Sequence, residues 1–118
     1  MATLTEKRHP KENDVLFVRK ALGFEEWEMM AALGGISSKT LTNWLRDPRT
    51  ALEDENLRFL KELIECAKGV IRRDKLSDWI HEPQEEFGGL TSAQMLTSHE
   101  TRGRVVALLR QLRHGNLA

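Results

Sequence analysis

The chain has 118 residues, of which 40% are hydrophobic and 31% are charged, and this suits one compact domain or two small modules that share a core. Its 18 basic and 18 acidic side chains cancel at neutral pH, so the total charge does not indicate a nucleic-acid partner. No apolar stretch approaches the roughly 18 residues that span a bilayer, and the single cysteine, Cys66, has no internal disulfide partner. We therefore expect a cytoplasmic protein with no membrane partner.

Charge is distributed unevenly along the chain. Residues 1–24 carry five Lys or Arg against three Asp or Glu, and residues 101–118 carry four Arg and no acid. Residues 75–100 carry one basic residue against five acidic ones. Both ends are thus basic and the segment between them is acidic. A solvated face and a partner surface are both compatible with such runs.

Hydrophobic spacing predicts helices and no strand. Residues 1–12 are polar, contain a proline and are expected to form a flexible arm. Polar caps, glycines and prolines then mark the ends of three short helices. These run from Asn13 or Asp14 to Leu22, from Glu25 to Leu33, and from Ser37 to the stop at Pro48.

The second half is predicted to be helical as well. Apolar residues recur every three or four positions after Asp54, which predicts one long amphipathic helix to about Arg72. Three shorter helices follow: one over 76–80, one that begins at Thr91 or Ser92, and one from Thr101 to His114. The predicted class is all-α, a compact helical bundle of six to eight helices.

The stretch GGISSKTLTNWLRD, residues 34–47, joins two predicted helices through a glycine turn. A helix-turn-helix needs a small residue in the first helix, a glycine with positive φ in the turn and an apolar anchor in the second helix. Ala31, Gly35 and Leu41 supply these residues at suitable spacing. The side expected to be buried carries Ile36, Leu41, Trp44 and Leu45.

The opposite side of this helix is predicted to contact operator DNA. An Asn side chain can pair with adenine, a Lys can reach guanine or a phosphate, and free N–H groups at a helix start suit a phosphate. The predicted DNA-binding residues are Ser37, Ser38, Lys39, Thr42, Asn43 and Arg46.

An αα-hairpin inside a bundle is the alternative for this segment. Gly34 stands where a helix-turn-helix usually has an apolar residue, and Glu25, Glu26 and Glu28 place acid on the preceding helix. DNA binding by a neutral monomer would be weak, so we expect a homodimer that reads an inverted repeat.

Residues 79–115, WIHEPQEEFGGLTSAQMLTSHETRGRVVALLRQLRHG, resemble the C-terminal domain of the MbcA/ParS/Xre antitoxin family. One residue departs from the family pattern: Ser92, directly after Thr91, stands where the family usually has a proline. Members of this family often carry an Xre-like helix-turn-helix before that domain. The residues that match the pattern are Trp79, Ile80, Pro83, Phe87, Gly88, Gly89, Thr91, Leu96, Thr97, Gly103, Val106, Leu109 and Gly115.

The resemblance implies a domain organisation and a function. Residues 13–52 would form the Xre-like helix-turn-helix domain, and residues 53–118 the toxin-binding domain. The protein would be the antitoxin of a type II toxin-antitoxin system that neutralises a RES-domain toxin, an NAD-consuming enzyme, and represses its own operon. We expect no enzymatic activity, small-molecule substrate, cofactor, metal or catalytic residue, since the sequence has no glycine-rich phosphate loop, no G-x-S-x-G and no zinc spacing.

The C-terminal end is the predicted toxin contact. An inhibitor of such an enzyme must fill or cover a concave pocket made for a polar ligand, and a short end led by a glycine is suited to entering one. A frayed terminus with no role is the alternative. The predicted toxin-binding residues are Arg110, Arg113, His114, Asn116, Leu117 and Ala118.

Two other functions stay open. The first is a free-standing transcriptional regulator whose C-terminal domain only dimerises the protein. The second is an enzyme with an unrecognised helical active site, which is disfavoured because no recognisable motif places an acid and base pair.

Overall fold

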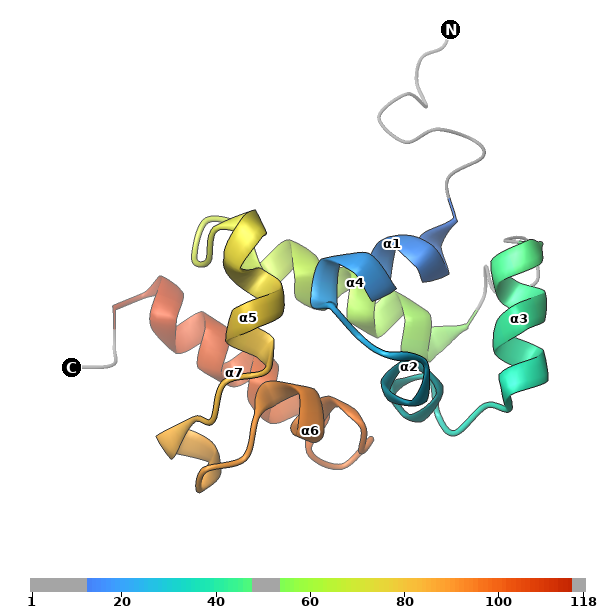
Figure 1. Ribbon diagram of the computed structural model, residues 1–118. Helices are drawn as coiled ribbons and strands as arrows, with labels where there is room; N and C mark the ends of the chain where they lie inside the picture. Colours follow the sequence, from blue (N-terminus) through green and yellow to red (C-terminus); the bar gives the residue numbers. More distant parts are fainter. Residues whose placement is uncertain (1–12, 48–53, 116–118) are drawn as a thin grey trace, which may run out of the picture.

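Helices make up the regular structure of the part of the chain that the computed structural model describes, residues 13–47 and 54–115, apart from one isolated bridge between Pro83 and Thr91 (Figure 1). The predicted all-α class is confirmed. The predicted arm, residues 1–12, and the predicted domain boundary after residue 52 lie outside the described residues. In chain order the elements are α1 (Asp14–Leu22), α2 (Glu26–Ala32), α3 (Ser38–Arg46), α4 (Glu55–Ala67), η3 (Arg73–Lys75), α5 (Leu76–Ile80), η4 (Glu85–Phe87), α6 (Ser92–Leu96) and α7 (Arg102–Arg113).

One hydrophobic core joins the first three helices to the rest of the molecule. α1 packs against α4 and α5, and α7 packs against α4 and α6. α3 lies at one edge of this arrangement and the C-terminal end of α7 at the opposite edge (Figure 1). The buried side chains at the centre come from several helices: Val18 and Leu22 of α1, Leu41 of α3, Leu60 of α4 and Leu109 of α7.

Local signals in the sequence set most helix ends. Asn13, Ser37 and Thr91 each accept a hydrogen bond from the first turn of the helix that they cap, as their residue types predict. Gly23 ends α1 with φ at +66°, and a Cβ at this position would collide with Ser77. The predicted starts and stops around these residues are confirmed.

The long helix predicted from Asp54 to about Arg72 is wrong at its C-terminal end. α4 stops at Ala67, because Lys68 is extended and Gly69 takes a φ of +81°. The carbonyl of Ala67 then accepts the N–H groups of Val70 and Ile71 at 3.1 and 3.0 Å. Ile71, which continues the helical spacing in the sequence, therefore packs against the core from a turn.

Candidate functional site

The connection between α2 and α3 is a tight turn that contains two glycines with positive φ. Gly34 has a φ of +94° and Gly35 one of +83°. The N–H groups of Gly35 and Ile36 both donate to the carbonyl of Met30, at 2.9 and 3.2 Å. A Cβ on Gly34 would lie 2.7 Å from Nδ2 of Asn56. The turn therefore requires the glycine that departs from the usual helix-turn-helix pattern.

Residues distant in the sequence hold this turn in place. Asn56, on α4, donates from Nδ2 to the carbonyl of Leu33 at 3.3 Å. Its Oδ1 accepts a hydrogen bond from Nη1 of Arg102, on α7, at 2.6 Å. The guanidinium of Arg102 also lies over the ring of Phe59, 4.3 Å from its centroid. The start of α3 is thus positioned by α4 and α7, which sequence spacing does not indicate.

The far end of α3 is positioned by α1. Asn13 caps α1 through Oδ1, which accepts the N–H groups of Val15 and Leu16 at 2.9 and 3.2 Å. Its Nδ2 donates to the carbonyls of Trp44 and Leu45 at 3.1 and 2.7 Å. The capping role is readable from the sequence, but the contact with α3 is not. Asn13 therefore fixes the orientation of α3 as well as the start of α1.

The inward side of α3 carries the four apolar residues that the spacing indicates, and they are buried to different extents. Leu41 is fully buried and anchors the helix, as the spacing indicates. Ile36, Trp44 and Leu45 pack against the core but are only half-buried, because α3 lies at the edge of the molecule. The four residues thus face the core, as predicted, and Leu41 is the most deeply buried of them.

All six predicted DNA-binding residues are exposed. Ser37 accepts the N–H of Thr40 at 3.0 Å, and the Ser38 hydroxyl donates to Glu26 at 2.9 Å. The other four form no side-chain hydrogen bond or ion pair within residues 13–47 and 54–115; they are Lys39, Thr42, Asn43 and Arg46.

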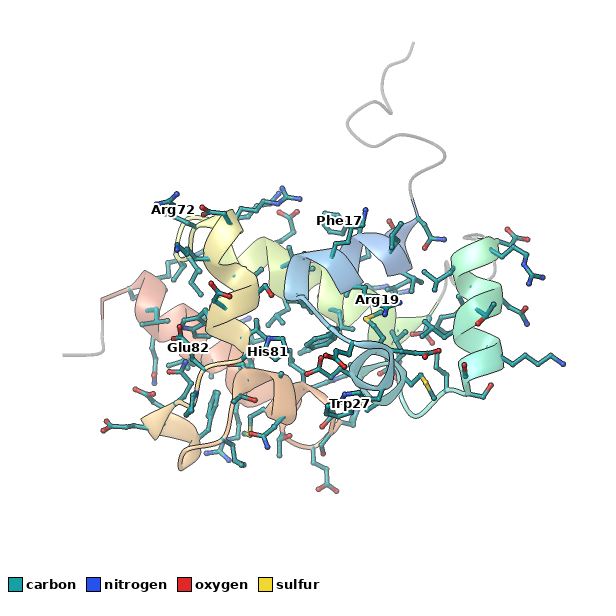
Figure 2. All side chains as sticks on the ribbon, in the orientation of Figure 1. Phe17, Arg19, Trp27, Arg72, His81 and Glu82 are labelled. Carbon is teal, nitrogen blue, oxygen red and sulfur yellow. The ribbon has the colours of Figure 1, made fainter. Side chains whose placement is uncertain are left out.

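The acids of α2 do not all face the solvent. Glu28 is buried, and its Oε1 accepts the N–H of Glu25 at 2.8 Å. Its Oε2 lies 3.0 Å from Nε2 of His81, whose Nδ1 lies 2.9 Å from the carbonyl of Ser77. Figure 2 shows His81 between α5 and α2, with Trp27 projecting nearby. Glu28 thus joins α2 to α5 and adds no exposed charge next to α3.

The predicted toxin contact is only partly within the described residues. Arg110 and His114 are exposed on α7 and at its end. Arg113 donates from Nη2 to the carbonyls of Cys66 and Lys68, at 2.8 and 3.2 Å. It therefore caps the C-terminal end of α4, a role that sequence reasoning missed. The other three predicted residues, Asn116, Leu117 and Ala118, lie outside the described residues.

The loop that carries the family resemblance is closed by its own hydrogen bonds. Gly88 and Gly89 have φ values of +67° and +93°. The N–H of Gln84 donates to the carbonyl of Leu90 at 3.0 Å, and the N–H of Gly89 donates to the carbonyl of Gln84 at 2.9 Å. Thr91 then begins α6 with a capping box that it shares with Gln94. The glycines of the pattern are thus needed for the shape of this loop.

Ser92, which departs from the family pattern, is the first residue of α6. Its hydroxyl is fully buried and has no hydrogen-bond partner among the described residues. Proline is favoured at the first position of a helix because its missing N–H would have no partner there. The backbone position of Ser92 is therefore one that favours a proline.

Within the described residues we find no group of three or more His, Cys, Asp or Glu that could hold a metal ion. In the same part of the chain, no helix combines the length and the apolar character needed to cross a membrane.

Comparisons with protein-family models, with curated proteins and with solved structures found no match to this chain. The resemblance to the antitoxin family therefore depends on the motif residues alone.

Proposed function

We propose that the protein is the antitoxin of a type II toxin-antitoxin system, which binds operator DNA through α3 and neutralises a RES-domain toxin through its C-terminal segment. The observation that carries the DNA-binding part is the exposed face of α3. The antitoxin part rests on the resemblance over residues 79–115. In this proposal the protein acts as a homodimer in the cytoplasm.

The spacing of the α3 side chains supports contact with a DNA groove. Lys39 and Asn43 are four residues apart, and so are Thr42 and Arg46, which places each pair on neighbouring turns of one helix face. None of these four side chains has a polar partner in the described part of the chain, so binding would break no internal contact there. The cations would hold phosphates, and Asn43 would read a base edge.

A DNA-binding assay tests this part of the proposal. The full chain is titrated against DNA from upstream of its own gene and against a scrambled duplex of equal length, at a fixed salt concentration. Specific binding should exceed non-specific binding by about a thousandfold or more. Equal affinity for the two duplexes would contradict operator recognition.

A purified NAD-consumption assay tests the antitoxin part. The proposal requires a RES-domain toxin encoded next to the gene, and this toxin is mixed with the full chain and with a variant that lacks residues 116–118. The full chain should abolish NAD consumption by the toxin. In the presence of the truncated chain the toxin should stay active, and the truncated chain should bind DNA as the full chain does. A toxin that the full chain does not inhibit would contradict the antitoxin proposal. Full inhibition by the truncated chain would mean that the body of the domain blocks the toxin.

One observation favours a second candidate, a free-standing regulator whose C-terminal segment only supports the fold and the dimer. Arg102 and Arg113, two of the four arginines after residue 100, are engaged with α4. Absence of a RES-domain toxin gene beside this gene would favour this candidate.

A further inference from the structure

A groove of about 780 Å³ lies between α1, the C-terminal end of α3 and η3. Three cations line it, namely Lys20, Arg46 and Arg73. Its apolar part includes Leu16, which is 40% exposed, and Phe17, whose ring centroid lies 5.5 Å from the guanidinium carbon of Arg73. Figure 2 shows Phe17 on the upper side of α1. We call this feature the basic groove.

The acid at the basic groove is paired. Asp74 also lines the groove, and its carboxylate accepts a hydrogen bond from Arg72 at 3.0 Å. Asn13 and Ser77 add neutral polar groups. The groove therefore offers net positive charge beside exposed apolar surface.

The loop between α5 and α6 has complementary properties. Glu82, Glu85 and Glu86 are exposed, and Leu90 is 46% exposed. The loop is closed by the bridge between Pro83 and Thr91 and by its own backbone hydrogen bonds. Docking would therefore need little ordering of the chain. We call residues 82–90 the acidic loop.

Arg104 is the cation beside the acidic loop, and it does not pair with the carboxylates of the loop. Its Nη2 lies 3.5 Å from the backbone carbonyl of Glu86, and its guanidinium carbon lies 5.8 Å from the ring centroid of Phe87. It contacts the base of the loop and forms no ion pair with the three glutamates, all of which are described residues.

We propose that copies of this chain associate head to tail, with the acidic loop of one copy docked in the basic groove of the next. Three carboxylates would meet three cations, and Leu90 would meet Leu16 and Phe17. Leu16 and Leu90 are two of the three exposed large hydrophobic residues among those described, Trp27 being the third. The chain has no net charge, so long-range repulsion does not oppose association.

The two surfaces are different patches of the molecule, so the contact is heterologous. Each added copy leaves one groove and one loop free, and association continues beyond a pair. This inference does not depend on binding of a toxin or of DNA. Arg46 belongs both to the basic groove and to the proposed DNA-binding face, so the test uses Lys20 and Arg73.

Charge-reversed variants of the full chain test the contact by sedimentation velocity over a wide range of protein concentration. The groove variant carries Lys20→Glu and Arg73→Glu, and the loop variant carries Glu85→Lys and Glu86→Lys. A matched control, Arg58→Glu with Arg110→Glu, changes the net charge as the groove variant does but alters exposed residues outside both patches. Circular dichroism verifies that each variant is folded.

The wild-type chain should form species larger than a dimer as concentration rises, and added salt should dissociate them. The groove variant and the loop variant should each associate about tenfold or more weakly than wild type, because like charges then face each other. A mixture of the two variants should associate again, since both contacts regain opposite charges. The matched control should behave like wild type.

Several outcomes would overturn the inference. A wild-type chain that stays monomeric would contradict both head-to-tail association and the proposed homodimer. A wild-type chain that stops at a dimer would contradict head-to-tail association alone. Failure of the mixed variants to associate would exclude the pairing of this loop with this groove. A monomeric wild type whose DNA affinity falls in the groove variant would identify the groove as a phosphate-binding surface instead.

Discussion

α3 and α7 both carry cations, and the two helices differ in what those cations contact. On α3, Lys39 and Arg46 form no side-chain hydrogen bond or ion pair within the described residues. On α7, Arg102 donates to Asn56, and Arg113 donates to the last carbonyls of α4. Substitution of cations that hold the fold together should therefore change stability, and substitution of cations on the exposed face of α3 should change binding.

The largest effect should come from removing the anchor of α3. Leu41 is fully buried, so Leu41→Ala should lower the free energy of unfolding by about 2 to 5 kcal/mol. Urea denaturation measures the difference. Thr42→Ala, at the exposed neighbouring position, should change stability little. Equal destabilisation in the two variants would show that the core does not hold α3.

A smaller destabilisation should follow from a change in the turn before α3. Gly34→Ala should cost about 1 to 2 kcal/mol, because the positive φ disfavours a Cβ and Asn56 occupies its place. Gly103→Ala is the control, since Gly103 lies in α7 with open space around it, and this change should stabilise the chain by about 0.5 to 1 kcal/mol. If Gly103→Ala destabilised the chain and Gly34→Ala did not, this account of the turn would be wrong.

The comparison between the two helices depends on Arg113. Arg113→Ala should cost about 1 kcal/mol, because two carbonyls at the end of α4 are then without their donor. Arg110→Ala, one turn earlier and without a polar partner among the described residues, should have almost no effect on stability. Thermal unfolding of both variants measures the difference. If the two substitutions have the same effect, the contrast between α3 and α7 does not hold.

The smallest effect should be a gain. Ser92→Pro should stabilise the chain by about 0.4 to 1 kcal/mol, since proline restricts the unfolded chain. Thr91, the preceding residue, already has the extended ψ of 159° that a following proline requires. Ser92→Ala removes only the buried hydroxyl, so it measures the effect of losing the hydroxyl separately from the effect of the proline ring. A decrease of stability in the proline variant, seen as a lower Tm, would mean that the site cannot accept the ring.

Much of the fold could be predicted from the sequence because its signals are local. The caps at Asn13, Ser37 and Thr91 and the stop at Gly23 act within one turn of their own helices. The end of α4 could not be predicted in this way, because Ile71 keeps the helical spacing after the backbone has turned at Gly69.

The exposed face of α3 could be predicted as well, since helical spacing separates it from the anchor, Leu41. The groups that position α3 could not. Asn13 contacts the end of α3 through backbone carbonyls 31 and 32 residues away, and Asn56 and Arg102 meet across 46 residues. Tertiary packing brings these groups together, and no local sequence pattern indicates their contacts.

The double variant Lys39→Ala with Asn43→Ala tests most directly whether the exposed face of α3 binds DNA and makes no contribution to stability. Its free energy of unfolding should stay within about 0.5 kcal/mol of wild type, because both side chains are exposed and have no polar partner among the described residues. Its operator binding should weaken by about 1 to 3 kcal/mol for each side chain that reads a base edge in the wild-type complex. Unchanged operator affinity in the folded variant, measured beside wild type at the same salt concentration, would contradict the proposed DNA-binding face.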